Sequence, residues 1–133
     1  VLTFEEIMCM LEGKDIKFAE MSGDTAYERN ASKLGLSFPL TAGVSAAVQD
    51  TVAAMGGEVH NAQYCSGLDK CRDTVKAAAA GKLDCSYIEG MACSNGCIDG
   101  PAAVGDFHIT KVALTKYAAA APNKQAAEDK HTK

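Results

Sequence analysis

The chain has 133 residues, of which 47% are hydrophobic and 23% are charged, a composition typical of one ordinary globular domain. Its net charge of −4 argues against nucleic-acid binding. Its apolar stretches, such as residues 42–48, are far shorter than the ~20 residues that a membrane span needs. The chain opens on Val1 without a basic segment and an apolar run. We therefore expect a cytoplasmic piece of a longer protein that binds neither nucleic acid nor membrane.

The first half of the chain predicts two helices separated by a loop. Thr3 and Glu6 form a capping box ahead of a helix whose apolar residues recur every third or fourth position. A short helical turn follows, and residues 22–37 are mostly polar and predict a loop. Thr41 is placed to cap a second helix, which ends at the glycine pair 56–57.

The second half alternates strands with helices. Residues 58–64 predict a strand, and Ser66 is placed to cap a helix that ends before Gly81. Residues 84–89 predict a second strand, and a loop rich in glycine and cysteine follows at 90–105. Residues 108–121 then predict the last helix, with Ile109, Val112, Ala113 and Tyr117 on its inward face. Strands that alternate with helices indicate an α/β fold, with a small sheet and flanking helices.

One domain is expected over residues 1–121. The polar residues 122–133 predict a disordered tail. So few strands make only a small sheet, which an upstream part of the same domain would complete. Apolar surface meant for that part would then be exposed and would favour self-association.

Six cysteines are many for a chain without a signal peptide, and they predict more than one role. Cys93 and Cys97 lie in a loop of small residues directly after a predicted strand. Thiolates at close spacing are the usual ligands of iron–sulfur clusters, and nearby glycines let backbone amides approach bound sulfide. Spacing alone leaves open an unrelated loop, a disulfide, a zinc site and a redox dithiol. The remaining cysteines, and His60 and His108, are better explained by packing or by the surface than by metal binding. These cysteines are Cys9, Cys65, Cys71 and Cys85.

The residues around this loop carry a longer pattern. Positions 87–100 read Tyr-Ile-Glu-Gly-Met-Ala-Cys-Ser-Asn-Gly-Cys-Ile-Asp-Gly. This run resembles the last of the three signature motifs of the iron-only (FeFe) hydrogenases. Further similarity to that family extends over roughly residues 1–118, including the Ala42-Gly43-Val44 turn into a helix. The two earlier motifs of the family are absent from the chain.

The resemblance implies a 4Fe-4S cluster linked through one cysteine to a two-iron centre that carries CO and cyanide. By this resemblance Cys93 binds the cubane, and Cys97 binds it and also bridges to the two-iron centre. Met91 would pack beside that centre. Thr41, Ala42 and Gly43 would approach it from the glycine-rich turn.

The reaction implied is reversible reduction of protons to dihydrogen, with electrons supplied by a ferredoxin-type donor. This piece would then be the C-terminal part of the catalytic domain and would need the upstream part of the same domain as its partner. Because it lacks the other ligands, we assign it no catalytic residue and expect it to be inactive alone. Whether it binds a cluster alone is left open. Two further functions remain, a hydrogenase-like assembly factor for iron–sulfur clusters and a hydrogen-sensing module without turnover.

Overall fold

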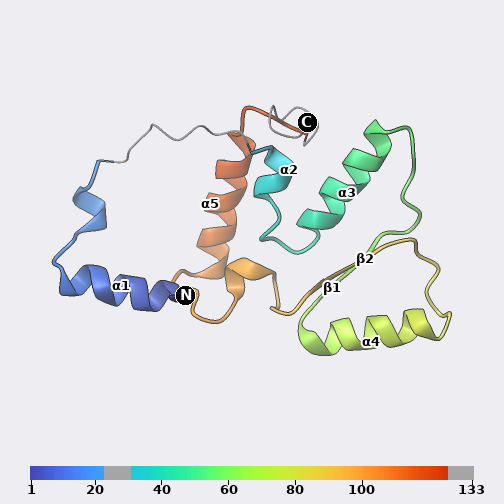
Figure 1. Ribbon diagram of the computed structural model, residues 1–133, viewed down its shortest axis with the longest axis horizontal. Coiled ribbons are helices and arrows are strands. Elements are labelled where there is room, and N and C mark those ends of the chain that lie inside the picture. Colours follow the sequence, from blue (N-terminus) through green and yellow to red (C-terminus); the bar gives the residue numbers. More distant parts are fainter. Residues whose placement is uncertain (23–30, 126–133) are drawn as a thin grey trace.

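The computed structural model of the chain describes residues 1–22 and 31–125. Within these ranges the chain forms five α-helices, two β-strands and two 3-10 turns, η1 and η2 (Figure 1). In chain order these are α1 (Phe4–Gly13), η1 (Phe18–Glu20), α2 (Lys33–Leu36), α3 (Gly43–Ala54), β1 (Gln63–Ser66), α4 (Leu68–Ala79), β2 (Ile88–Met91), η2 (Cys97–Asp99) and α5 (Phe107–Ala119).

The two strands form a small parallel sheet. Gln63 of β1 pairs with Ile88 of β2, and the pairing continues to Ser66 with Met91. A parallel pair needs a crossover connection, and here α4 provides it and runs alongside the sheet (Figure 1). The predicted α/β class, with a small sheet and flanking helices, is therefore confirmed.

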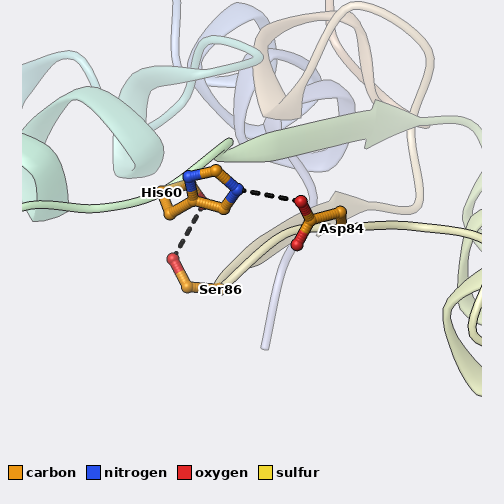
Figure 2. A network of polar contacts seen from close by, with 3 residues as sticks. All are labelled: His60, Asp84 and Ser86. Carbon is orange, nitrogen blue, oxygen red and sulfur yellow. Dashed lines mark hydrogen bonds and ion pairs between the residues drawn. The ribbon is translucent and has the colours of Figure 1, made fainter.

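Both strands begin several residues later than the sequence predicted, because polar contacts occupy the segments that precede them. His60 Nε2 lies 3.1 Å from Asp84 Oδ2. Ser86 donates from both its amide and its hydroxyl to the His60 carbonyl, at 3.0 and 2.9 Å (Figure 2). The hydroxyl thus bonds backbone and not the imidazole ring, so these three residues are no catalytic triad. They join the two segments just before the strands pair, which helps to set the parallel register.

The helix ends show which of the predicted capping residues are correct. The capping box of Thr3 and Glu6 is present as predicted, with bonds of 2.7 and 3.2 Å. The predicted loop at 22–37 is wrong in part, because Ser32 caps the short helix α2 through the Gly35 amide at 3.0 Å. Residues 23–30 lie outside the described part of the chain. Ser66 is the last residue of β1 and not a helix cap, and Gly67 takes the cap position of α4 without a side-chain bond.

Very little apolar surface is buried among the described residues. The buried hydrophobic side chains are Ala47, Cys65 and Ala118. The face of α5 that was predicted to point inward is instead exposed, with Ile109 at 73% and Val112 at 53%. This prediction is wrong for the chain taken alone. Large apolar side chains exposed together on one helix face are typical of a surface that another element covers.

The start of the predicted tail contacts the helices. Lys33 donates its amide to the Asn123 carbonyl at 2.8 Å, and Gln125 Nε2 donates to Asp50 Oδ1 at 3.3 Å. Residues 126–133 lie outside the described part, so the division into a domain and a tail stays a prediction. In the part of the chain that the structure describes, each helix is too short or too polar to cross a membrane.

Candidate metal centre

Strand β2 leads directly into the loop that carries Cys93 and Cys97. The chain leaves Met91 and turns at Asn95 and Gly96, both of which have positive φ, of 67° and 92°. The Gly96 amide donates to the Cys93 carbonyl at 3.3 Å. As the sequence predicted, the two cysteines therefore lie in a loop that follows a strand and not in a continuous helix.

The loop is fixed to the segment that precedes α3. Leu40 and Gly96 form an antiparallel bridge, and the Cys97 amide donates to the Pro39 carbonyl at 2.8 Å. Nearly sixty positions separate these partners in the sequence, yet the bridge holds their backbones in contact. The segment before α3 therefore lies against the cysteine loop. The predicted approach of Thr41, Ala42 and Gly43 to a two-iron centre stays a prediction.

Glu89 makes the second connection between the loop and α3. Its side chain is buried, with 5% exposed. The carboxylate accepts from the Ala42 amide at 3.0 Å and from the Ser45 amide at 2.6 Å. A carboxylate at a helix N-terminus satisfies free amides and interacts favourably with the helix dipole. Glu89 therefore takes the capping role that was predicted for Thr41, and that prediction is wrong.

The turn itself has a tight geometry. Ala42 occupies the N-cap position with φ of 67°. A Cβ on Gly43 would lie 2.0 Å from the Ser37 carbonyl oxygen, so glycine is required there. Thr41 has a buried hydroxyl oxygen for which the structure gives no hydrogen-bond partner. The turn thus places one unsatisfied polar atom close to the cysteine loop.

Gly96 leaves no room for a side chain between the loop and the turn. A Cβ there would lie 2.4 Å from the Pro39 oxygen and 2.9 Å from the Thr41 nitrogen. We expect Gly96→Ala to lower the free energy of unfolding by about 3 kcal/mol, since it adds a backbone clash to the strain of a positive φ. Urea unfolding followed by circular dichroism measures this loss.

Gly56→Ala is the matched control, because Gly56 also has positive φ, 79°, but has nothing within 4 Å of its Cβ position. It should cost only the backbone strain, about 1 kcal/mol. Equal losses for the two variants would mean that the close approach at Gly96 does not exist.

The two cysteine side chains differ in their surroundings. Cys93 is half-buried and Cys97 is exposed. A Cβ on Gly100 would lie 3.3 Å from Cys93 Sγ, so the glycine leaves space beside that sulfur. Cys97 lines an apolar cavity of about 520 Å³. The other residues that line it are Phe4, Pro39, Ile98, Ala103, Val104, Gly105 and Thr110.

Met91 lies at the end of β2, half-buried, with its carbonyl accepting from the Gly67 amide at 2.9 Å. It is therefore two residues from Cys93 on the strand that delivers the loop. Its predicted place beside a two-iron centre stays a prediction.

A second pair of cysteines, Cys65 of β1 and Cys71 of α4, lies in close contact. Cys65 Sγ lies 3.3 Å from Cys71 Sγ, and both thiols are free. The hydrogen bond between them, followed by burial, raises the pKa of Cys71 above that of an ordinary thiol. No local pattern predicts this contact, because a strand residue and a helix residue six positions apart meet only if the turn between them is tight.

The loop supplies part of the set of thiolates that a 4Fe-4S cluster needs. A cubane has four thiolate ligands, and the loop offers two, Cys93 and Cys97. Over residues 1–22 and 31–125, the structure has no group of three or more histidine, cysteine or acidic residues that could hold a metal ion. The loop thus offers two of the four thiolates that a cubane needs.

Residues 1–101 match the family model described as iron only hydrogenase large subunit, C-terminal domain. The chain belongs to this family. The match covers the turn, both strands and the cysteine loop, and it ends before α5, which the resemblance had included. The iron-only hydrogenase family implies iron–sulfur cofactors in the complete protein. No curated protein is similar enough to the chain to give a match.

Proposed function

We propose that the chain is part of the catalytic domain of an iron-only hydrogenase and contributes the last cysteine motif to its metal centre. The reaction is the reversible combination of two protons and two electrons to dihydrogen. The observation that carries the proposal is the backbone bridge between Leu40 and Gly96, which holds the cysteine loop against the turn before α3 within the part of the chain that matches the family.

In this proposal Cys93 and Cys97 would supply two thiolates to a 4Fe-4S cluster, and Cys97 would also hold the linked two-iron centre. Bound there, the cofactor would supply the redox chemistry. The chain's own residues orient it: Gly96 and Glu89 fix the loop, and Gly100 leaves room at the Cys93 sulfur. Met91, Thr41, Ala42 and Gly43 would form the adjacent wall.

Surroundings of low polarity favour this arrangement. The cavity beside Cys97 is lined mainly by apolar side chains, among them Phe4, Pro39 and Val104. A cavity of this kind limits the access of water and lowers the local dielectric constant, which tunes the potential of a bound cluster. The protein therefore controls the environment of the cluster as well as its ligands.

The partner that we propose is the upstream part of the same catalytic domain. It would provide the missing thiolates and cover exposed apolar residues such as Met55, Ile109 and Val112. A ferredoxin-type protein would deliver the electrons. The cytoplasm is the proposed compartment, because thiolate ligands must stay reduced. Without the upstream part, the same exposed faces would promote self-association.

The test compares the longer protein that carries this segment with the 133-residue chain. Both are matured anaerobically and reduced with dithionite and a viologen dye, and dihydrogen is measured by gas chromatography. We expect evolution of dihydrogen from the longer protein and none from the chain alone, because the chain supplies two of the thiolates. Infrared spectra of the longer protein should show the bands of metal-bound CO and cyanide.

Dihydrogen evolved by the chain alone would contradict the proposal that other segments supply the remaining cluster ligands. A longer protein with an ordinary cubane, no CO or cyanide bands and no turnover would instead be an assembly factor. The bands without turnover, together with a response of a partner domain to dihydrogen, would identify a sensor.

A further inference from the structure

Cys65 and Cys71 form a close thiol pair that the proposed metal centre does not use. Cys65 is in β1 with 7% of its surface exposed, and Cys71 is in the first half of α4, half-buried. Their sulfurs are 3.3 Å apart. The glycine between strand and helix, Gly67, has φ of 91°, a conformation that suits the sharp turn bringing the two thiols together.

The space around the pair suits a disulfide. The sulfurs need to approach by roughly 1 Å to reach the bond length of about 2.0 Å, which small side-chain rotations can provide. Gly90 of β2 lies against both sulfurs, since a Cβ there would be 3.5 Å from Cys71 Sγ and 3.8 Å from Cys65 Sγ. The absence of a side chain at Gly90 leaves the pair room to adjust.

We propose that Cys65 and Cys71 form a reversible disulfide, a site of oxidative modification separate from the Cys93–Cys97 loop. The oxidant is a small-molecule disulfide such as oxidised glutathione. One thiolate attacks a sulfur of the reagent and releases one thiol. The second cysteine then attacks the mixed disulfide, which forms the Cys65–Cys71 bond and releases the second thiol. The two cysteines lose two electrons and two protons, and the reagent gains them.

This bond would change the contacts of strand β2. In the reduced chain Cys71 Sγ lies 3.3 Å from the Met91 carbonyl, and Cys65 Sγ lies 3.5 Å from the Glu89 carbonyl. Oxidation removes both thiol hydrogens, so neither sulfur can donate to these carbonyls. Because Glu89 and Met91 lie on the strand that leads to the cysteine loop, the modification reaches the segment that holds Cys93.

The experiment is an anaerobic titration of the purified 133-residue chain with mixtures of reduced and oxidised glutathione. Free thiols are trapped with iodoacetamide, and tryptic peptides are analysed by mass spectrometry. Cleavage after Lys70 and Arg72 separates the two cysteines, so the bond joins peptide 34–70 to the dipeptide Cys71-Arg72. We expect this linked product, with both cysteines unalkylated, while Cys9 and Cys85 are still alkylated.

Two controls make the result specific. Cys71→Ser should abolish the linked product, and Cys85→Ser should leave it unchanged. The relevant ratio is the concentration of oxidised glutathione divided by the square of the concentration of reduced glutathione. In urea, half-formation of the Cys65–Cys71 bond should need about a tenfold higher value of this ratio, because the folded chain holds the two sulfurs together. Equal ratios with and without urea would overturn the proposal. Three outcomes for the native chain would also overturn it. Cys65 and Cys71 could remain free thiols that iodoacetamide alkylates, they could stop at the mixed disulfide with glutathione, or they could pair with other cysteines without preference.

Discussion

Cys97→Ser in the longer protein is expected to remove both dihydrogen turnover and the infrared bands of metal-bound CO and cyanide. A serine oxygen is a hard donor with a much higher pKa than a thiol, so it is a poor substitute where iron needs a thiolate. Loss of an outer hydrogen-bond partner of a ligand already costs up to about a hundredfold in activity, and loss of a bridging ligand should exceed this. The viologen assay and infrared spectroscopy measure the two effects.

Cys9→Ser is the matched control, because Cys9 is exposed on α1 and the motif assigns it no role. It should keep both the bands and the turnover. Cys71→Ala should also keep them and should lower the free energy of unfolding by about 1 kcal/mol, as for a small, half-buried side chain. If Cys97→Ser keeps bands and turnover while Cys71→Ala loses both, the ligand assignment is wrong.

Glu89→Gln is expected to lower the free energy of unfolding by about 3 kcal/mol. The buried carboxylate accepts from two amides, those of Ala42 and Ser45, and bonds to a charged acceptor contribute about 1.5–3 kcal/mol each. Glutamine keeps the shape of the side chain, but one of its terminal groups is an NH₂, which turns a donor toward an amide that also donates. The variant also removes the negative charge from the N-terminus of α3.

Urea unfolding followed by circular dichroism measures this loss, and hydrogen exchange locates it. Exchange should accelerate most at the amides of Ala42 and Ser45, while α1 should be unaffected. Glu58→Gln makes the same chemical change at an exposed position and should shift stability by no more than about 0.5 kcal/mol. Equal unfolding free energies for the two variants would show that the Glu89 carboxylate does not hold α3.

Some signals that act over three or four residues were read correctly from the sequence. The capping box at Thr3 and Glu6 is present, because both partners lie in the same helical turn. The class of fold and the place of the cysteine loop after a strand are also as predicted. These features depend on local patterns of apolar residues and on the small residues around Cys93 and Cys97.

Contacts between distant segments were not predictable in this way. The sequence pointed to Thr41 as the cap of α3, yet the cap is Glu89, 47 positions away from Ala42. The Thr41 pattern is a genuine local signal, but the buried carboxylate provides two bonds where a hydroxyl would provide one. Ser66 likewise resembles a cap, but pairing with Met91 draws it into β1. In both cases a tertiary contact outweighs a local preference.

The same reason explains the misassigned face of α5. Its apolar spacing predicts an inner face, and the spacing is real, but no described element covers Ile109 and Val112. A sequence pattern shows which side of a helix is apolar. It does not show which segment packs against that side.

The two-stranded parallel sheet has a consequence for handling the chain. Each strand pairs along one edge only, so over the described residues the outer edges of β1 and β2 have no neighbouring strand. Unpaired edges are templates on which another strand can add, and parallel sheets are normally covered on both faces. Chains produced without the rest of the domain can therefore join edge to edge into larger assemblies even where their apolar helix faces are masked. Lysine substitutions at outward-facing edge positions such as Tyr64, which is 59% exposed, would block this route without touching the cysteine loop.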